Sequence, residues 1–139
     1  MKVRFVLALI LSQLALPALA DKPLAPDSVP GTTRVSAEQA LELILANPRM
    51  AIIDSRHAEE YAKGHIEGAI SLLDIDTSAK TLARYIHHHN SPVLLYCNGE
   101  RCMRSSNAAT IAVNAGYKKI YWFRGGWAEW VEKKMPIAQ

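Results

Sequence analysis

The residues best suited to chemistry lie in one loop that follows an apolar stretch. Residues 93–96 are apolar, Cys97 comes next, and the loop beyond it carries Arg101 and Arg104. A cysteine reacts as its thiolate, and nearby cations, backbone N–H groups and a helix N-terminus lower the thiol pKa below its usual value of about 8.5. The pattern predicts a buried strand that delivers a nucleophilic thiol, Cys97, into an anion-binding loop.

The other residues of the loop belong to the same predicted site. Arg101 or Arg104 can bind the oxygens of an anion through paired hydrogen bonds. Glu100 opposes an anion, so its carboxylate is expected to face solvent or to pair with Arg101. Ser105, with Ser106 and Asn107, is expected to cap the helix that follows the loop. The remaining residues of the predicted site are Asn98, Gly99, Cys102 and Met103.

These residues also have structural interpretations. Cys97 could be a small buried residue at a strand end, as free cysteines commonly are. Arg101 could form a surface ion pair, and Arg104 could pair with Asp54 or Glu60. The glycine and the two cations close to Cys97 favour the chemical interpretation.

Residues 1–20 have the three parts of a cleavable secretory signal. Lys2 and Arg4 precede an apolar stretch over residues 5–11, and Ala18-Leu19-Ala20 stands at the end. An uncleaved membrane anchor is the alternative, but the stretch is shorter than the roughly 18 to 20 apolar residues of a spanning helix. We expect export across the inner membrane to the periplasm, and no membrane span once the signal is removed.

Charge and length limit the remaining chain to a small, nearly neutral protein. Loss of Lys2 and Arg4 reduces 16 basic residues to 14, against 13 acidic ones, so the net charge falls from +3 to +1. Such a balance gives no reason to expect a nucleic-acid partner. We expect a proline-rich, extended lead-in outside the core over residues 21–31, and one domain over residues 32–139.

Two cysteines are too few for a disulfide scaffold or a four-ligand zinc site. In an oxidising compartment Cys97 and Cys102 could instead join in a small ring, which would block the nucleophile until it is reduced. The side chains of His87, His88 and His89 point in different directions on a helix end, so we expect a solvated terminus there. We therefore predict neither a metal nor a cofactor.

Strand-like and helix-like segments alternate along the domain, which is typical of a parallel sheet covered by helices. Ligands bind such sheets beyond the carboxyl ends of the strands, where Asp54, Arg56 and Cys97 lie. The expected strands cover residues 51–54, 68–72, 93–96 and 119–123. The expected helices cover residues 37–46, 59–62, 78–88 and 108–115, and a last one begins at residue 127.

In this order the motifs resemble the rhodanese-like superfamily of single-domain sulfurtransferases. The matching segments are residues 53–56, 60–70, 95–97, 104–105, 108–109, 115–117 and 124–127. The resemblance implies a five-stranded, mainly parallel sheet with helices on both faces, and a loop whose backbone amides, here those of residues 98–103, surround the sulfur of Cys97. It also implies that Asp54 and Arg56 brace this loop or take part in charge networks near it. His65, between Gly64 and Ile66, is expected to fix a turn by bonding to the backbone.

In active members of the family, this cysteine takes a sulfane sulfur from a donor such as thiosulfate, becomes a persulfide, and passes the sulfur to cyanide or a thiol. The loop of this chain departs from the family pattern, in which a glycine follows the cysteine by three residues and an Arg-Ser pair by five and six. Here Gly99 follows by two and Arg104-Ser105 by seven and eight. The loop is about two residues longer, contains Cys102, and lacks the five-residue cysteine-to-arginine separation of rhodanese-related phosphatases.

Three functions follow from these observations. The first is an exported sulfurtransferase that uses a Cys97 persulfide, with a small sulfur-donor anion and cyanide or a thiol as its partners. The second is a thiol redox or relay protein in which Cys102 resolves Cys97, with a redox partner protein. The third is a sulfur- or anion-binding module without turnover.

Overall fold

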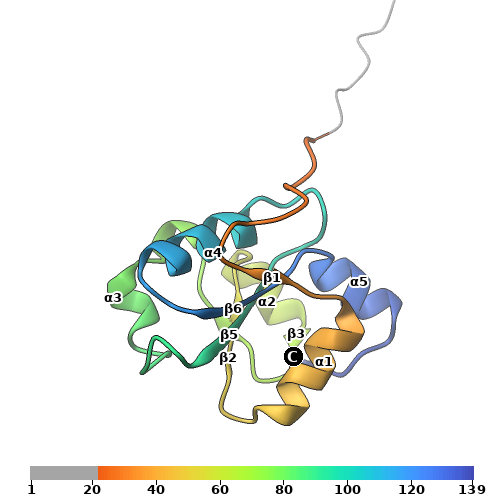
Figure 1. Cartoon of the computed structure of the whole chain (residues 1–139). Helices are drawn as coiled ribbons and strands as arrows, with labels where there is room; N and C mark the ends of the chain where they lie inside the picture. Colours follow the sequence, from red (N-terminus) through yellow and green to blue (C-terminus); the bar gives the residue numbers. More distant parts are fainter. Residues whose placement is uncertain (1–21) are drawn as a thin grey trace, which may run out of the picture.

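The structure, a computed structural model, describes residues 22–139 (Figure 1). The expected secretory signal over residues 1–20 lies outside the described residues, so export stays a prediction. No helix within residues 22–139 has the length and apolar character needed to cross a membrane.

Five parallel strands form the central sheet, in the order β1-β6-β5-β2-β4. Asp54, Tyr96 and Phe123 are partners across β2, β5 and β6, so these three strands end at the same level. The loops that follow them therefore lie side by side at the carboxyl edge. The strands are β1 (Thr33–Arg34), β2 (Ala51–Asp54), β4 (Ile70–Ser71), β5 (Pro92–Tyr96) and β6 (Lys119–Phe123).

Helices cover both faces of the sheet, as expected, because the central strand is buried on both sides. Val93 and Leu95 of β5 pack in a core with α3 (Ala79–Leu82) and α4 (Arg104–Asn114). Leu94 and Tyr96 face the opposite core, to which α1 (Ala37–Ala46) and α5 (Gly126–Glu132) contribute (Figure 1). Two short helices, α2 (Ala58–Lys63) and the 3₁₀ turn η1 (Asp74–Asp76), complete the domain.

Local sequence explains where α1 begins and why α3 is shorter than expected. Ser36 caps α1 through a capping box with Gln39, and the helix ends before Asn47. The helix expected over residues 78–88 stops at Leu82, after which Arg84 and Tyr85 form tighter bonds to carbonyls three residues back. His87, His88 and His89 are exposed, so no packing stabilises further helical turns there.

Several features of the fold were not predicted, among them the edge strand β1 and the turn η1. Residues 22–31 contain no regular element, as expected for an extended lead-in. We expected this segment to lie outside the core, but Ala25 and Val29 are buried in the core beside α4. A separate antiparallel pair joins β3 (His65–Ile66) to β7 (Ile137–Ala138). Strands of two residues carry no periodicity that a sequence could reveal.

Candidate active site

Cys97 follows β5 directly and forms a disulfide with Cys102, whose Cα lies 6.3 Å away. Cys97 is 1% exposed and Cys102 is 9% exposed. The small ring is therefore present, and the oxidised site contains no nucleophilic thiol. The nucleophilic thiol expected at Cys97 is therefore available only after the disulfide is reduced.

The sulfur of Cys97 nevertheless lies among groups that stabilise negative charge. The backbone N–H of Ser105 donates to Cys97 Sγ at 3.4 Å, and Ser105 Oγ lies 3.3 Å from the same sulfur. Trp122 Nε1 donates to Ser105 Oγ at 2.9 Å, which leaves the hydroxyl proton free to point at the sulfur. Both donors belong to the first turn of α4, whose N-terminus favours an anion.

This arrangement corrects two details of the predicted loop. Met103 stands at the N-cap of α4, and Ser105 lies inside the helix, where it contacts the sulfur and does not cap. The amides of residues 98–103 were expected to surround the sulfur, but the N–H of Cys102 bonds to the carbonyl of Gly99 at 3.0 Å. Among residues 22–139, the backbone N–H that donates to Cys97 Sγ is that of Ser105.

The start of α5 holds the first residues of the loop in place. The N–H groups of Trp127 and Ala128 donate to the carbonyls of Cys97 and Asn98 at 2.8 and 2.9 Å. Gly126 has a φ of 54°, and a Cβ at this position would collide with the backbone of Cys97. A glycine is therefore required where α5 meets the loop.

Neither arginine of the loop makes the ion pair considered for it. Arg101 is exposed, and its Nη1 donates to the backbone carbonyl of Lys22. Arg104 Nη1 lies 3.8 Å from Cys102 Sγ, while its Nη2 donates to His57 Nε2 at 2.9 Å. Within residues 22–139 no carboxylate oxygen lies within 4.0 Å of a nitrogen of either guanidinium, so both keep their charge available for an anion.

The charge of Arg104 still acts on Glu60. Burial opposes ionisation of this carboxyl group, but a hydrogen bond from Asn98, another from the N–H of His57, and the charge of Arg104 lower the pKa of Glu60. A negative charge on Glu60 thus stabilises the side chain of Asn98 at the start of the loop.

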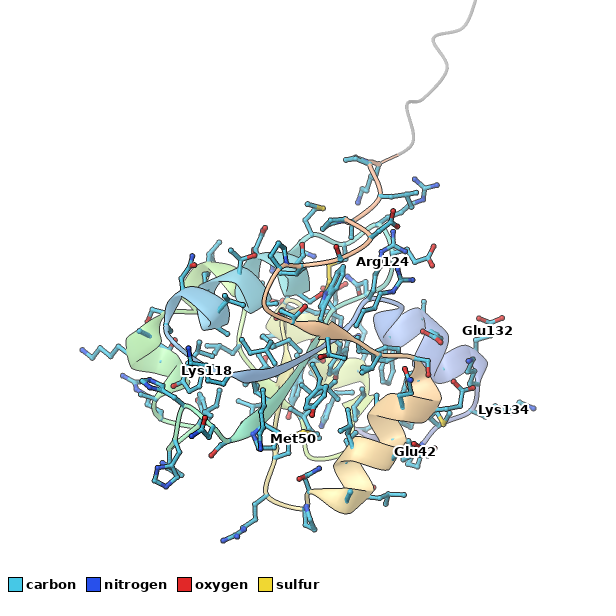
Figure 2. The ribbon with its side chains drawn as sticks, viewed as in Figure 1. Glu42, Met50, Lys118, Arg124, Glu132 and Lys134 are labelled. Atoms are coloured by element: carbon cyan, nitrogen blue, oxygen red, sulfur yellow. A yellow bond between two sulfur atoms is a disulfide. The ribbon has the colours of Figure 1, made fainter. Side chains whose placement is uncertain are left out.

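Arg124 is the functional residue that sequence reasoning missed. Glu100 is 60% exposed and pairs with Arg124 at 3.3 Å, not with Arg101. The buried Arg124 side chain also donates to the carbonyls of Ala25 and Pro26, both at 2.9 Å (Figure 2). It thereby joins the lead-in to the loop. The 124–127 segment was interpreted as a turn and as one of the segments that match the family, and nothing in its spacing indicates these partners.

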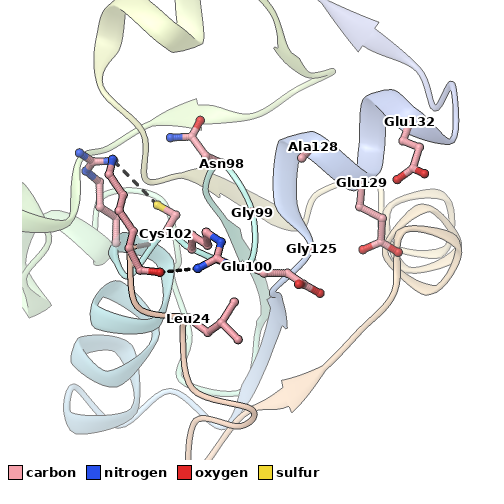
Figure 3. Close-up of a pocket in the computed structure, with 12 residues that line it drawn as sticks. Leu24, Asn98, Gly99, Glu100, Cys102, Gly125, Ala128, Glu129 and Glu132 are labelled. Atoms are coloured by element: carbon pink, nitrogen blue, oxygen red, sulfur yellow. Dashed lines mark hydrogen bonds between the residues drawn. The ribbon is translucent and has the colours of Figure 1, made fainter. Parts of the chain in front are cut away.

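A pocket of about 650 Å³ opens beside the disulfide (Figure 3). Cys102 lines it and Cys97 does not. Of the residues predicted to bind substrate, all but Met103 line this pocket: Asn98, Gly99, Glu100, Arg101, Cys102 and Arg104. The other charged residues in its wall are Lys22, Glu129 and Glu132.

Asp54 and Arg56 form a buried ion pair next to the site. Arg56 Nη2 lies 2.7 Å from Asp54 Oδ2 and also donates to the Gly64 carbonyl, and its guanidinium lies 4.7 Å from the centre of the Trp127 ring. Burial alone would lower the pKa of Arg56, but the hydrogen bonds and charge of Asp54 raise it. Tyr96 donates to Asp54 Oδ2 at 2.7 Å and accepts from the N–H of Ile66. These contacts connect the ends of β2 and β5 to α5.

Tyr96→Phe is expected to reduce stability by about 1–3 kcal/mol at pH 8, because it leaves the N–H of Ile66 without a partner and removes one of the hydrogen bonds to Asp54 Oδ2, which keeps Arg56. Burial, followed by the Asp54 charge, raises the pKa of Tyr96. The native state then holds a proton that the unfolded chain releases above about pH 10, so the wild type loses stability as pH rises. The difference between wild type and variant should therefore shrink from pH 8 to pH 11 in urea unfolding. A constant difference would contradict this prediction.

The remaining histidines lie away from the disulfide. His65 is buried, its Nδ1 lies 2.9 Å from the Tyr61 carbonyl, and its ring stacks on that of Tyr61, which fits the turn-fixing role expected for it. The ring of His89 contacts Tyr117 edge to face, and His87 and His88 are exposed. Residues 22–139 contain no cluster of three side chains suited to hold a metal ion.

Comparison with known proteins identifies the family. Residues 36–133 match the model of the rhodanese-like domain, so the chain belongs to the rhodanese-like family. It is 27% identical over 105 residues to the thiosulfate sulfurtransferase GlpE of Glaesserella parasuis, covering 76% of this chain and 92% of that protein. It is also 28% identical over 89 residues to YibN of Escherichia coli K12, covering 63% of this chain but only 60% of the length of YibN.

Solved structures show the same fold. The polysulfide-sulfur transferase homodimer of Wolinella succinogenes superposes with a TM-score of 0.65 at 23% identity. The match covers 79% of this chain and 80% of that one. At this identity, the likeness establishes the architecture of the domain and not its activity.

Proposed function

We propose that this protein is a sulfurtransferase that carries a sulfane sulfur on Cys97 once the disulfide is reduced. The observation that carries this proposal is the convergence of the Ser105 N–H, the Ser105 hydroxyl and the start of α4 on the sulfur of Cys97. These groups favour a thiolate, the nucleophilic form of cysteine. The similarity to the thiosulfate sulfurtransferase GlpE supports the same chemistry.

The reaction has two steps. The Cys97 thiolate attacks the outer sulfur of thiosulfate, the S–S bond of the donor breaks, and sulfite leaves with the electron pair. Cyanide or a thiolate then attacks the outer sulfur of the Cys97 persulfide and releases the Cys97 thiolate. Arg101 and Arg104 border the pocket with no carboxylate partner among residues 22–139, so they can bind the sulfonate oxygens of the donor.

Export is part of the proposal. The basic start, short apolar stretch and small residues before Asp21 support a cleavable signal and a periplasmic location. Fractionation of cells that express the full chain, with N-terminal sequencing of the product, tests this: a protein that keeps residues 1–20 in the cytoplasm would contradict it.

A redox or relay function is the second candidate, and the Cys97–Cys102 disulfide favours it. In that case the pair would exchange electrons with a partner protein and would not pass on a sulfur atom. The two functions predict different products from the same starting protein.

The test measures thiocyanate formation from thiosulfate and cyanide by the domain over residues 22–139, before and after reduction. Reduction is expected to increase the rate by at least ~10²-fold, because only the thiolate is a nucleophile. After reaction with thiosulfate alone, the mass should increase by one sulfur atom on the peptide that contains Cys97. A reduced protein that forms neither thiocyanate nor the adduct, but readily reduces or oxidises other disulfides, would favour the redox function.

A further inference from the structure

We propose that Cys102 is the sulfur through which the site is reduced: a small thiol that carries a carboxylate attacks Cys102 Sγ from the pocket, and Cys97 leaves as the thiolate. This inference deepens the proposed function, because opening the disulfide is the step that frees Cys97. It also gives the second cysteine and the longer loop a role.

Access to the two sulfurs supports attack at Cys102. Cys102 lines the 650 Å³ pocket, whereas Cys97 is 1% exposed and does not line it. An incoming thiolate approaches the sulfur that it attacks from the side opposite the departing sulfur, and in the disulfide form Cys102 is the sulfur that borders the pocket. Figure 3 shows Cys102 at the wall of the pocket, with Glu129 and Glu132 of α5 across from it.

The stability of the departing thiolate also supports attack at Cys102, because Cys97 is then the leaving group. Disulfide exchange is faster when the departing thiolate is the more stable one. The Ser105 N–H and hydroxyl lie 3.4 and 3.3 Å from Cys97 Sγ, at the N-terminus of the eleven-residue helix α4. Charge that develops on Cys97 as the S–S bond breaks is therefore stabilised by donors already in place.

Arg104 is the group that could favour the opposite reaction, in which the thiol attacks Cys97 and Cys102 leaves as the thiolate. Its Nη1 lies 3.8 Å from Cys102 Sγ and would stabilise a thiolate there. The guanidinium is, however, partly exposed and also bound to His57, so water weakens its effect on the sulfur. From the pocket side, the same charge attracts an incoming thiolate toward Cys102.

The charges around the pocket select the kind of thiol. Among residues 22–139, the guanidinium groups of Arg101 and Arg104 have no carboxylate partner. Of the three acidic residues in the wall, Glu100 pairs with Arg124 at 3.3 Å, and Glu129 shares Lys133, at 3.3 Å, with Glu38. Lys22 adds a third cation to the wall. The local field therefore favours an anion, and a thiol with a carboxylate fits it better than a neutral or cationic one.

The exchange is balanced as two thiol–disulfide steps. The incoming thiolate forms a bond to Cys102 Sγ, the Cys97–Cys102 bond breaks, and its electron pair goes to Cys97. A second thiol then attacks the bound thiol's sulfur and releases the Cys102 thiolate. In total the protein disulfide is reduced to two thiols and two small thiols are oxidised to one small disulfide.

The test maps the mixed disulfide in the wild-type domain. The oxidised protein is mixed with 3-mercaptopropionate, the exchange is stopped in acid after a short time, and the free thiols are then alkylated with N-ethylmaleimide. Trypsin cleaves after Arg101 and so places Cys97 and Cys102 on different peptides. We expect mercaptopropionate on the Cys102 peptide and maleimide on the Cys97 peptide. The reverse distribution, or equal labelling of both peptides by mercaptopropionate, would overturn the proposal.

A series of thiols tests the charge preference. At equal thiolate concentration and low salt, 3-mercaptopropionate should open the disulfide about 10-fold faster than cysteamine, with 2-mercaptoethanol between them, and salt should reduce the difference. Arg101→Gln should weaken the preference, whereas Arg84→Gln, at an exposed position away from the pocket, should keep it. Cysteamine reacting as fast as 3-mercaptopropionate would refute the carboxylate preference. None of these measurements requires thiocyanate formation. A failure of the proposed reduction through Cys102 can therefore be told apart from a failure of the proposed sulfur transfer.

Discussion

Cys97→Ser is expected to abolish sulfur transfer, with a loss of at least ~10³-fold in thiocyanate formation by the reduced protein. A serine hydroxyl at this position cannot form a persulfide, and the donors from Ser105 then face an oxygen that stays protonated at neutral pH. The fold should persist, because the replacement is small and the strand that precedes Cys97 keeps its partners in β2 and β6. Circular dichroism and unfolding by urea check that the loss is chemical.

Cys102→Ser is the matched variant for this experiment. It cannot form the disulfide, so its thiocyanate formation should no longer depend on added reductant, whereas the wild type requires reduction. It should also gain the mass of one sulfur atom on the Cys97 peptide after exposure to thiosulfate. If Cys97→Ser retains transfer while Cys102→Ser loses it, the nucleophile has been assigned to the wrong cysteine.

Alternation of segments in the sequence predicted the sheet and the position of Cys97 well. The apolar stretch before Cys97 can only be a buried strand, and β2, β5 and β6 are where the pattern placed them. In a parallel sheet the ends of neighbouring strands meet at one edge, so Asp54 and Cys97 were expected near each other. The register of Asp54 with Tyr96 confirms this.

The partners of individual side chains could not be predicted in the same way. Ser105 has the residue type and position of a helix cap, but the helix begins at Arg104 and turns its hydroxyl toward Cys97. Arg124 and Glu100 are 24 positions apart, and only the alignment of β5 with β6 brings them together. Such pairings depend on tertiary structure, whereas sequence periodicity reports only which face of an element is buried.

Arg56→Met is expected to reduce the free energy of unfolding by about 3–5 kcal/mol, because it leaves the carboxylate of Asp54 buried without its cation. The variant also loses the hydrogen bond to the Gly64 carbonyl and the contact with the Trp127 ring. For a domain of this size the change corresponds to a fall in Tm of about 10–20 °C. Arg84→Met, at an exposed arginine without an ion pair among residues 22–139, should change Tm by only a few degrees.

The double variant Asp54→Asn with Arg56→Met separates the burial of a charge from the loss of packing. If the uncompensated carboxylate causes most of the damage, removing it should restore part of the stability, and the double variant should be more stable than Arg56→Met alone. If the stability losses of the two single variants simply add in the double variant, the two residues act independently. Their 2.7 Å ion pair argues against that outcome. Because Trp127 packs on Arg56 and its N–H holds the carbonyl of Cys97, the single variant should also loosen the loop. Faster amide exchange at Trp127 and Ala128 in Arg56→Met, relative to Arg84→Met, would measure that effect.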